Sequence, residues 1–220
     1  SDIYSVTSKC DKEFLLKNFK NRNNSKIIIR PNWVILKNDF TQNLNEKRNS
    51  KKIVSVGRLE TQKNYSLIIK ALEGSDYELD IFGNGSLKHV LAKEAEKLNV
   101  NINFHGIVDN KDLVKSLKDY KFYISSSIFE GNPKSVLEAM ASGCVIIASD
   151  IKNHTEFLNE NNALLFNNND DSLKNLFQNL NIDEKKLNNL RDNSIITVKK
   201  LYSLDSLVKN ELSDILELTS

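Results

Sequence analysis

The stretch FYISSSIFEGNPKSVLEAMASGCVIIAS, residues 122–149, decides the fold. A short apolar run at each end flanks a segment with helical composition. Asn132 followed by Pro133 predicts the start of that helix, with Asn132 as its N-cap, and Gly143 predicts its end. The stretch therefore predicts a strand, a helix and a second strand, which is the repeating unit of parallel sheets.

The same alternation extends through the chain from about Lys52 onward. Apolar runs alternate with amphipathic stretches, which indicates parallel strands joined by helical crossovers. We therefore predict an α/β fold with a doubly wound parallel sheet. The predicted strands are residues 53–56, 79–82, 101–105, 122–124 and 145–148, and the predicted helices are residues 65–72, 87–98, 113–117 (after Asp109 as N-cap), 184–201 and 204–218.

The first part of the chain follows a different plan. Residues 3–7 and 27–29 are predicted strands around a helix at 11–19, and this βαβ unit is too small to bury a sheet face. Since the sequence opens with Ser1 and enters directly into a strand, we expect it to begin within a longer protein. The predicted divisions are a remnant of an N-terminal domain (1–36), a polar linker (37–50), the main domain (51–201) and a C-terminal helix (202–220).

Composition narrows the class of protein. The 220 residues are 40% hydrophobic and 27% charged, as in ordinary globular proteins. Because 31 Lys and Arg nearly balance 29 Asp and Glu, the chain has no strong positive potential that would favour binding of nucleic acid. Cys10 and Cys144 have neither metal-ligand nor redox spacing, which favours a reducing, cytoplasmic setting and predicts no metal site. No apolar run has the length needed to cross a bilayer.

Two predicted strand ends carry residues suited to a phosphate. Gly57, Arg58 and Lys63 follow the first long strand, at the edge where open α/β sheets bind ligands, and the two cations can hold a diphosphate. Spacing alone does not exclude two solvated surface cations. The next strand runs into Gly83-Asn84-Gly85 and then a helix, whose free N–H groups attract anions. A tight turn alone also explains these glycines.

The third strand end is the most informative. The helix after Pro133 directs its positive dipole end toward the ligand edge of the sheet. Glu130 lies just before this helix, and Glu138 lies in its second turn among apolar or small neighbours. A carboxylate in such surroundings is expected to be partly buried, and it then needs a partner such as ribose hydroxyls, a lysine or a backbone group. An exposed Glu138 on a polar stripe is the alternative.

Taken in series, these motifs resemble the GT-B glycosyltransferases, specifically the retaining family called GT4 or glycosyltransferases group 1. The resemblance runs from Lys52 to about Phe166. The family's G-R-L-x-x-x-K, G-x-G, F-x-G and E-x7-E motifs are matched at residues 57–63, 83–85, 104–106 and 130–138, and Ala139-Met140-Ala141-Ser142-Gly143 follows. The implied fold is the Rossmann-like donor half of a GT-B enzyme.

The resemblance implies a role for each motif. Arg58 and Lys63 would neutralise the diphosphate of a UDP- or GDP-linked sugar, while Glu130 would contact the transferred sugar and Glu138 the ribose hydroxyls. Such catalysis depends on leaving-group electrostatics and implies no cofactor. The further donor-binding residues implied are Gly57, Gly83, Asn84, Gly85, Gly106, Ile107 and Val108 beside the base, and Gly131, Asn132, Lys134 and Ser135.

The resemblance also implies a missing partner domain. In complete members an N-terminal domain binds the acceptor, a sugar or glycolipid, and the final helix crosses back onto it. We therefore expect residues 202–220 to carry an exposed apolar face that includes Leu207 and Leu212. The expected setting is polysaccharide or glycoconjugate synthesis in the cytoplasm, with peripheral attachment to the inner membrane face left open. We expect the chain to bind UDP or GDP weakly and to turn over no sugar.

Two departures from the family pattern affect the site. Gly131-Asn132-Pro133 replaces a Gly-Phe-Gly sequence, and Pro133 offers no N–H to a phosphate or sugar. Lys152-Asn153 replaces a Gly-Gly pair, which puts sugar contacts from that loop in doubt. The following His154 is predicted to be a surface or helix-start residue without a catalytic role.

Three other classes of protein remain to be compared with this interpretation. A non-catalytic nucleotide-sugar-binding module would share the site but would have no acceptor domain encoded upstream. A nucleotide-sugar epimerase of the same fold would not predict Glu130 and Glu138 at this spacing. A dinucleotide-dependent oxidoreductase is disfavoured because no G-x-G-x-x-G follows the first long strand.

Overall fold

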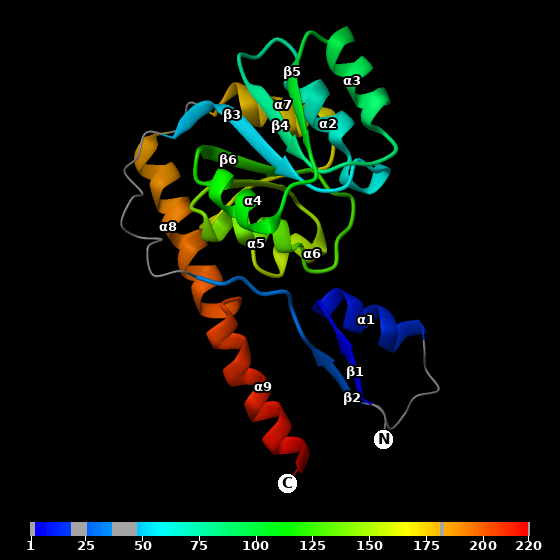
Figure 1. Cartoon of the computed structure of the whole chain (residues 1–220), viewed down its shortest axis with the longest axis vertical. Helices are drawn as coiled ribbons and strands as arrows, with labels where there is room; N and C mark the ends of the chain where they lie inside the picture. The colour runs from blue at the N-terminus through cyan, green and yellow to red at the C-terminus, as the bar shows by residue number, and fades with distance from the viewer. Residues whose placement is uncertain (1–2, 19–25, 37–47, 181–182, 220) are drawn as a thin grey trace.

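A computed structural model describes residues 3–18, 26–36, 48–180 and 183–219. Its centre is a six-stranded sheet in the order β5-β4-β3-β6-β7-β8, and every neighbouring pair is parallel (Figure 1). The predicted doubly wound sheet is therefore confirmed. The strands are β3 (Asn49–Val56), β4 (Glu78–Phe82), β5 (Asn101–Gly106), β6 (Tyr120–Ser125), β7 (Val145–Ser149) and β8 (Leu164–Phe166).

The order of the strands creates a switch point between β3 and β6. From β3 the chain moves outward through β4 to β5, and it then returns to add β6, β7 and β8 on the other side of β3. The connections after β3 and β6 therefore leave the sheet in opposite directions. Such a divergence opens a crevice at the carboxyl ends of the two strands, where open α/β sheets bind ligands.

Helices cover both faces of the sheet (Figure 1). Alternate strand residues face opposite sides, so Ile53 packs with the core of α2, α3 and α7 while its neighbour Val54 packs with that of α4 and α5. All five residues of β7 are buried, as expected for a strand covered on both faces. These helices are α2 (Tyr65–Ala71), α3 (Lys88–Lys97), α4 (Asn110–Leu117), α5 (Lys134–Ala141) and α7 (Asp170–Gln178), with a short 3-10 turn at Thr61–Lys63.

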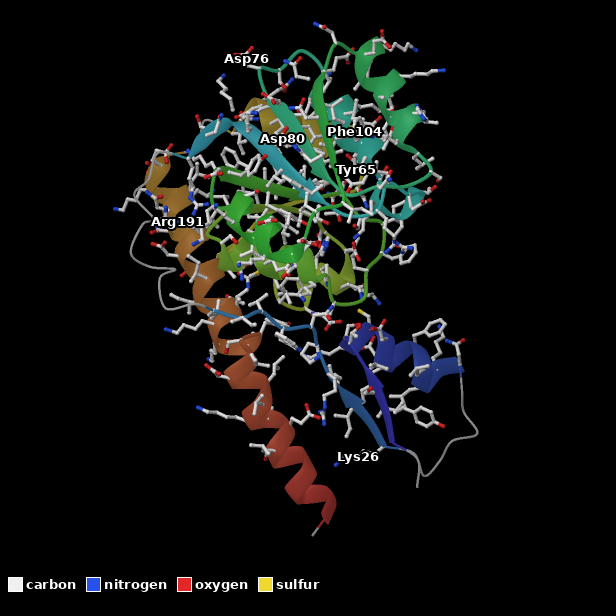
Figure 2. The ribbon with its side chains drawn as sticks, viewed as in Figure 1. Lys26, Tyr65, Asp76, Asp80, Phe104 and Arg191 are labelled. Atoms are coloured by element: carbon white, nitrogen blue, oxygen red, sulfur yellow. The ribbon has the colours of Figure 1, made fainter. Side chains whose placement is uncertain are left out.

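The small unit at the start of the chain contains β1 (Ile3–Val6), α1 (Lys9–Asn18) and β2 (Lys26–Ile29), with parallel strands as predicted. Figure 2 labels Lys26 in this unit and Asp80 and Phe104 in the large sheet. The carboxylate of Glu156, just beyond α6 (Lys152–Thr155), accepts the backbone N–H groups of Lys9 (3.0 Å) and Cys10 (2.9 Å) and so caps α1.

The C-terminal part of the chain forms α8 (Glu184–Leu201) and α9 (Leu204–Thr219). Helix α9 extends alongside the small unit (Figure 1), and Arg30 pairs with Glu211 at 3.2 Å. Val208 and Leu212 on α9 are exposed, whereas Leu207 is half-buried. The predicted apolar face is thus present in part.

Several local predictions differ from the structure. The N-cap of α5 is Pro133, and Asn132 contacts the backbone of Asn32 in place of capping the helix. β3 begins at Asn49, two residues before the predicted domain boundary, whereas residues 37–47 of the predicted linker lie outside the described residues. Gly143 has a φ of 76° directly after the C-cap Ser142, as predicted for a C′ glycine.

Candidate functional site

An ion pair lies at the switch point of the sheet. Lys63 follows β3, Glu130 follows β6, and the Lys63 ammonium contacts Oε1 of the Glu130 carboxylate. The two side chains are only 17% and 9% exposed. The topology thus brings together two residues that are 67 positions apart, at the edge of the sheet where their predicted ligand would bind.

Hydrogen bonds of Ser127 and Gln62 hold the loop that carries Glu130 in place. Ser127 donates its hydroxyl to Glu130 Oε1 at 2.5 Å. Gln62, beside Lys63, accepts the Ile128 amide at 2.9 Å and donates its side-chain amide to the Phe129 carbonyl at 2.8 Å. The described residues place no donor on the other carboxylate oxygen, Oε2, which leaves that oxygen able to accept a hydrogen bond from a ligand hydroxyl.

The glycines of the first two motifs have a packing role. Gly83 has a φ of 143°, and a Cβ there would lie 1.9 Å from the Gly57 carbonyl oxygen. A Cβ at Gly85 would lie 2.5 Å from the Leu59 carbonyl oxygen. The loops after β3 and β4 therefore touch backbone to backbone, which explains the Gly-x-Gly without a ligand. Asn84 between these glycines is exposed, and so is Arg58.

The predicted base-binding residues form the next part of the same edge. Gly106 ends β5 with a φ of 74° and accepts the Gly83 amide at 2.7 Å. Ile107 is the most exposed large apolar residue described, at 83%, and Val108 is half-buried. An exposed apolar side chain such as that of Ile107 is suited to contact with a planar ring.

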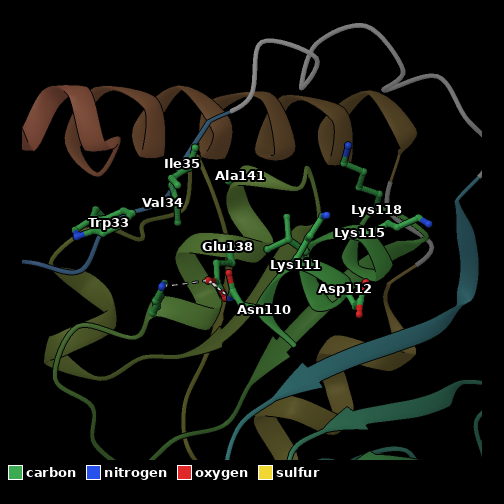
Figure 3. Close-up of a pocket in the computed structure, with 12 residues that line it drawn as sticks. Trp33, Val34, Ile35, Asn110, Lys111, Asp112, Lys115, Lys118, Glu138 and Ala141 are labelled. Atoms are coloured by element: carbon green, nitrogen blue, oxygen red, sulfur yellow. Dashed lines mark hydrogen bonds and ion pairs between the residues drawn. The ribbon is translucent and has the colours of Figure 1, made fainter. Parts of the chain in front are cut away.

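Glu138 lies in a cavity of about 660 Å³ bordered by α4, α5 and residues 33–35, which follow β2 (Figure 3). The Asn110 amide donates to its Oε1 at 2.7 Å, and the Lys134 ammonium lies 3.8 Å from the same oxygen. Burial raises the pKa of Glu138, against the lowering effects of Asn110 and Lys134. The predicted burial of this carboxylate, and its need for a partner, are therefore seen in the structure.

This cavity does not contain the whole predicted site. It is lined by Trp33, Val34, Ile35, Asn110, Lys111, Asp112, Val114, Lys115, Lys118, Lys134, Glu138 and Ala141. Arg58, Lys63 and Glu130 are not among these lining residues. Between these groups the Tyr123 hydroxyl donates a hydrogen bond to Ser135 Oγ at 3.0 Å, and burial raises its pKa.

The loop between Glu130 and α5 contacts the small N-terminal unit. A Cβ at Gly131 would lie 3.0 Å from Thr7 Oγ1, and Asn132 is buried with its side-chain oxygen accepting the Asn32 amide at 2.8 Å. The Lys134 ammonium lies 5.5 Å from the centre of the Trp33 ring. Three predicted donor-binding residues are therefore also contacts to the start of the chain.

The expectation that His154 is a surface or helix-start residue holds in its second alternative only. His154 lies in the first turn of α6, and it is fully buried rather than at the surface. Its neighbour Asn153, which replaces a family glycine, donates to the Gly131 carbonyl at 3.3 Å. Sequence reasoning also missed Asn110 and Ser127 as partners of the two glutamates. The repeated serines at 125–127 after a buried strand were the available signal for Ser127.

The parallel sheet and its switch-point ion pair define an α/β protein with a candidate ligand site at the strand ends. Residues 37–196 match the family model described as glycosyl transferases group 1, and the chain belongs to that family. Residues from β3 to most of α8 fall within the match. None of the helices in the described residues is both long and apolar enough to span a bilayer.

Known proteins similar to this chain are glycosyltransferases of the GT-B fold. A Campylobacter jejuni protein, N-acetylgalactosamine-N,N'-diacetylbacillosaminyl-diphospho-undecaprenol 4-alpha-N-acetylgalactosaminyltransferase, is 30% identical over 155 residues, covering 69% of this chain and 42% of that protein. The catalytic domain of the Helicobacter pylori cholesterol-alpha-glucosyltransferase is 26% identical with a TM-score of 0.63, over 69% of this chain and 99% of that one.

A third similarity extends over almost the whole chain. The pneumococcal O-GlcNAc transferase GtfA, in complex with UDP and GlcNAc, is 19% identical with a TM-score of 0.79, over 99% of this chain and 45% of that one. At that identity the likeness concerns the fold alone. The chain spans between 17% and 43% of the length of the curated relatives that it matches.

Proposed function

We propose that this chain forms the nucleotide-sugar-binding half of a retaining glycosyltransferase, which transfers a sugar from a UDP- or GDP-linked donor to an acceptor hydroxyl in polysaccharide or glycoconjugate synthesis. The ion pair of Lys63 and Glu130 at the switch point carries this proposal. In this proposal the cation would meet the diphosphate of the donor, and the neighbouring carboxylate would meet the transferred sugar. No metal or cofactor takes part in the proposed reaction.

The geometry supports a distinct task for each part of the edge. Lys63 and the exposed Arg58 would stabilise the diphosphate as the bond from the anomeric carbon to the phosphate oxygen breaks. That electron pair leaves with the diphosphate, and the acceptor oxygen forms the new bond as its hydroxyl proton is released. Glu130 would accept a hydrogen bond from the transferred sugar through Oε2, and Glu138 would accept the ribose hydroxyls in exchange for Asn110.

The relatives support the class of reaction. The C. jejuni relative is named as an N-acetylgalactosaminyltransferase acting on a diphospho-undecaprenol. Since the chain spans only part of such proteins, the acceptor is proposed to bind a further domain. The chain by itself is then expected to bind the donor weakly and to transfer no sugar.

The proposal can be tested by measuring the binding of a panel of nucleoside diphosphates and their sugars, first by thermal shift and then by calorimetry. We expect binding of UDP or GDP and of the corresponding sugar. The double variant Arg58→Ala, Lys63→Ala should lose most of this affinity while still unfolding cooperatively. Unchanged affinity in a folded double variant would remove the diphosphate assignment. Conversion of a free nucleotide sugar into its epimer would support the epimerase alternative.

A further inference from the structure

His154 is a buried titratable residue to which the proposed reaction assigns no role. It lies in α6 with no exposed surface, beside the last residues of β6 and β7. Its Nδ1 is 2.8 Å from the Ser149 carbonyl oxygen and 3.3 Å from the Ser149 hydroxyl, and its Nε2 is 3.5 Å from the Ser125 hydroxyl. Both ring nitrogens therefore face the ends of strands next to the switch point.

The direction of each hydrogen bond follows from the chemistry of its partners. A carbonyl oxygen can only accept, so Nδ1 of His154 carries the proton and donates it to Ser149. The Ser149 hydroxyl in turn donates a hydrogen bond to the Ser127 carbonyl oxygen at 2.7 Å. Burial lowers the pKa of His154, which favours the neutral ring and leaves Nε2 as an acceptor for Ser125.

The same chain of bonds reaches the carboxylate at the switch point. The Ser127 carbonyl accepts both the Ser149 hydroxyl and the side-chain amide of Asn168, the latter at 3.0 Å. With its backbone held in this way, Ser127 donates its hydroxyl to Glu130 Oε1 at 2.5 Å. The imidazole is thus connected to the carboxylate through Ser149 and Ser127, and every donor in the connection has an acceptor.

We propose that His154 is a positioning residue that acts through Ser149 and Ser127 to orient the Glu130 carboxylate toward the transferred sugar. This inference rests on the proposed function, because Glu130 has a sugar hydroxyl to bind only when the ligand is a nucleotide sugar. Its consequence is specific. Loss of the imidazole should weaken binding of a nucleoside diphosphate sugar more than binding of the nucleoside diphosphate alone, whereas a residue that only fills the core should affect both equally.

The variants His154→Leu and His154→Asn separate these two roles. Leucine removes both ring nitrogens, whereas the amide of asparagine lies near the position of Nδ1 and can still donate to Ser149. Cys144→Ala is the matched control, because Cys144 is also fully buried but precedes β7 at the opposite end of the strand. Calorimetry with UDP and UDP-glucose, and with GDP and GDP-mannose, gives the ratio of the two affinities for each variant.

We expect His154→Leu to reduce the affinity for the nucleotide sugar about tenfold relative to the nucleotide, and His154→Asn to recover most of that loss. Cys144→Ala should leave the ratio unchanged. An unchanged ratio in His154→Leu, while Glu130→Gln lowers it, would overturn the positioning role and leave the proposed function intact. An unchanged ratio in Glu130→Gln would instead count against the sugar contact of Glu130 in the proposed function.

Hydrogen exchange of a backbone amide, measured without ligand, tests the inference independently of nucleotide binding. The Ile128 amide is bonded to the Gln62 carbonyl at 2.9 Å and reports whether the loop of Ser127 and Glu130 is held in place. We expect this amide to exchange faster in His154→Leu than in Cys144→Ala, even if the wild-type protein binds none of the nucleotides. Equal exchange in the two variants would overturn the inference.

Discussion

The side-chain amide of Asn110 donates a hydrogen bond of 2.7 Å to the Glu138 carboxylate, which joins the start of α4 to the second turn of α5. Burial nevertheless raises the pKa of Glu138. Because the folded chain then binds a proton at this site more tightly than the unfolded chain does, ionised Glu138 reduces stability as the pH rises through the folded pKa. The site retains a charge that the apo protein would be more stable without.

Glu138→Gln should therefore stabilise the free protein and weaken nucleotide binding. The glutamine oxygen can still accept from Asn110 but carries no buried charge. We expect the Tm at pH 7 to rise by about 2–4 °C and the affinity for the nucleoside diphosphate to fall about tenfold. Glu160→Gln, at an exposed position, is the control and should change neither. A lower Tm with unchanged affinity would contradict the assignment.

Arg58→Ala should separate binding from stability. Arg58 is exposed, so its removal is expected to change the free energy of unfolding by less than about 0.5 kcal/mol. If it pairs with a diphosphate, its loss should weaken UDP or GDP binding about tenfold or more. Lys93→Ala removes another exposed cation, on α3, as a matched control. Equal affinities of the two variants, measured by calorimetry, would argue against a phosphate contact.

Gly83→Ala tests the backbone contact between the loops after β3 and β4. A Cβ would lie 1.9 Å from the Gly57 carbonyl oxygen, so the backbone has to move. We expect a loss of about 3 kcal/mol or more in urea denaturation. At Gly74 the φ of 73° is also left-handed, but nothing lies within 4 Å of a Cβ. Gly74→Ala should therefore cost only about 1 kcal/mol, and similar losses for both would refute the steric argument.

The lowered pKa of Asp80 predicts that the folded chain loses part of its stability at low pH. Burial acts to raise the pKa of Asp80, but donation from Tyr120 (2.6 Å), Asn103 and His105 outweighs burial and lowers it. The stability that the ionised carboxylate contributes is thus fully present above its unfolded pKa of about 3.9 and is lost as the pH falls through the folded pKa.

Asp80→Asn should cost about 2 kcal/mol at pH 7 and should unfold with a shallower dependence on pH below about pH 4. Urea denaturation at pH 7, 5, 4 and 3 measures both effects. Asp76→Asn, which removes an exposed carboxylate, is the control. Parallel stability curves for wild type and Asp80→Asn across the acid range would show that Asp80 is not responsible.

The sequence was sufficient for most of the fold because its signals are local. Apolar runs located five of the six strands of the large sheet, and residues 184–201 coincide with α8. The short β8 and helix α7 were not predicted, and α6 was anticipated only in the alternative that His154 lies at a helix start. Three residues of β8 give too little periodicity to recognise, and the Asn-rich segment before α7 is typical of a loop.

The site was predictable in its motifs but not in its partners. The spacing of Glu130 and Glu138 could be read directly, yet the contact of Glu130 with Lys63 depends on two strands becoming neighbours across the switch point. The burial of His154 depends in the same way on β6 and β7 lying side by side. The apolar neighbours of Glu138 predict its burial, but the local sequence around Lys63 and His154 carries no such sign, so their environment follows only from the tertiary structure.

The carboxylate that caps α1 has a consequence for synthesis of the chain. Glu156 lies 146 positions after Cys10, so during translation the first turn of α1 has left the ribosome long before its acceptor has been made. The exposed N–H groups of Lys9 and Cys10 must then remain hydrated until the strand ending at Ser149 joins its neighbours. Completion of the cap on α1 therefore belongs to a late stage of maturation, although α1 is synthesised long before Glu156.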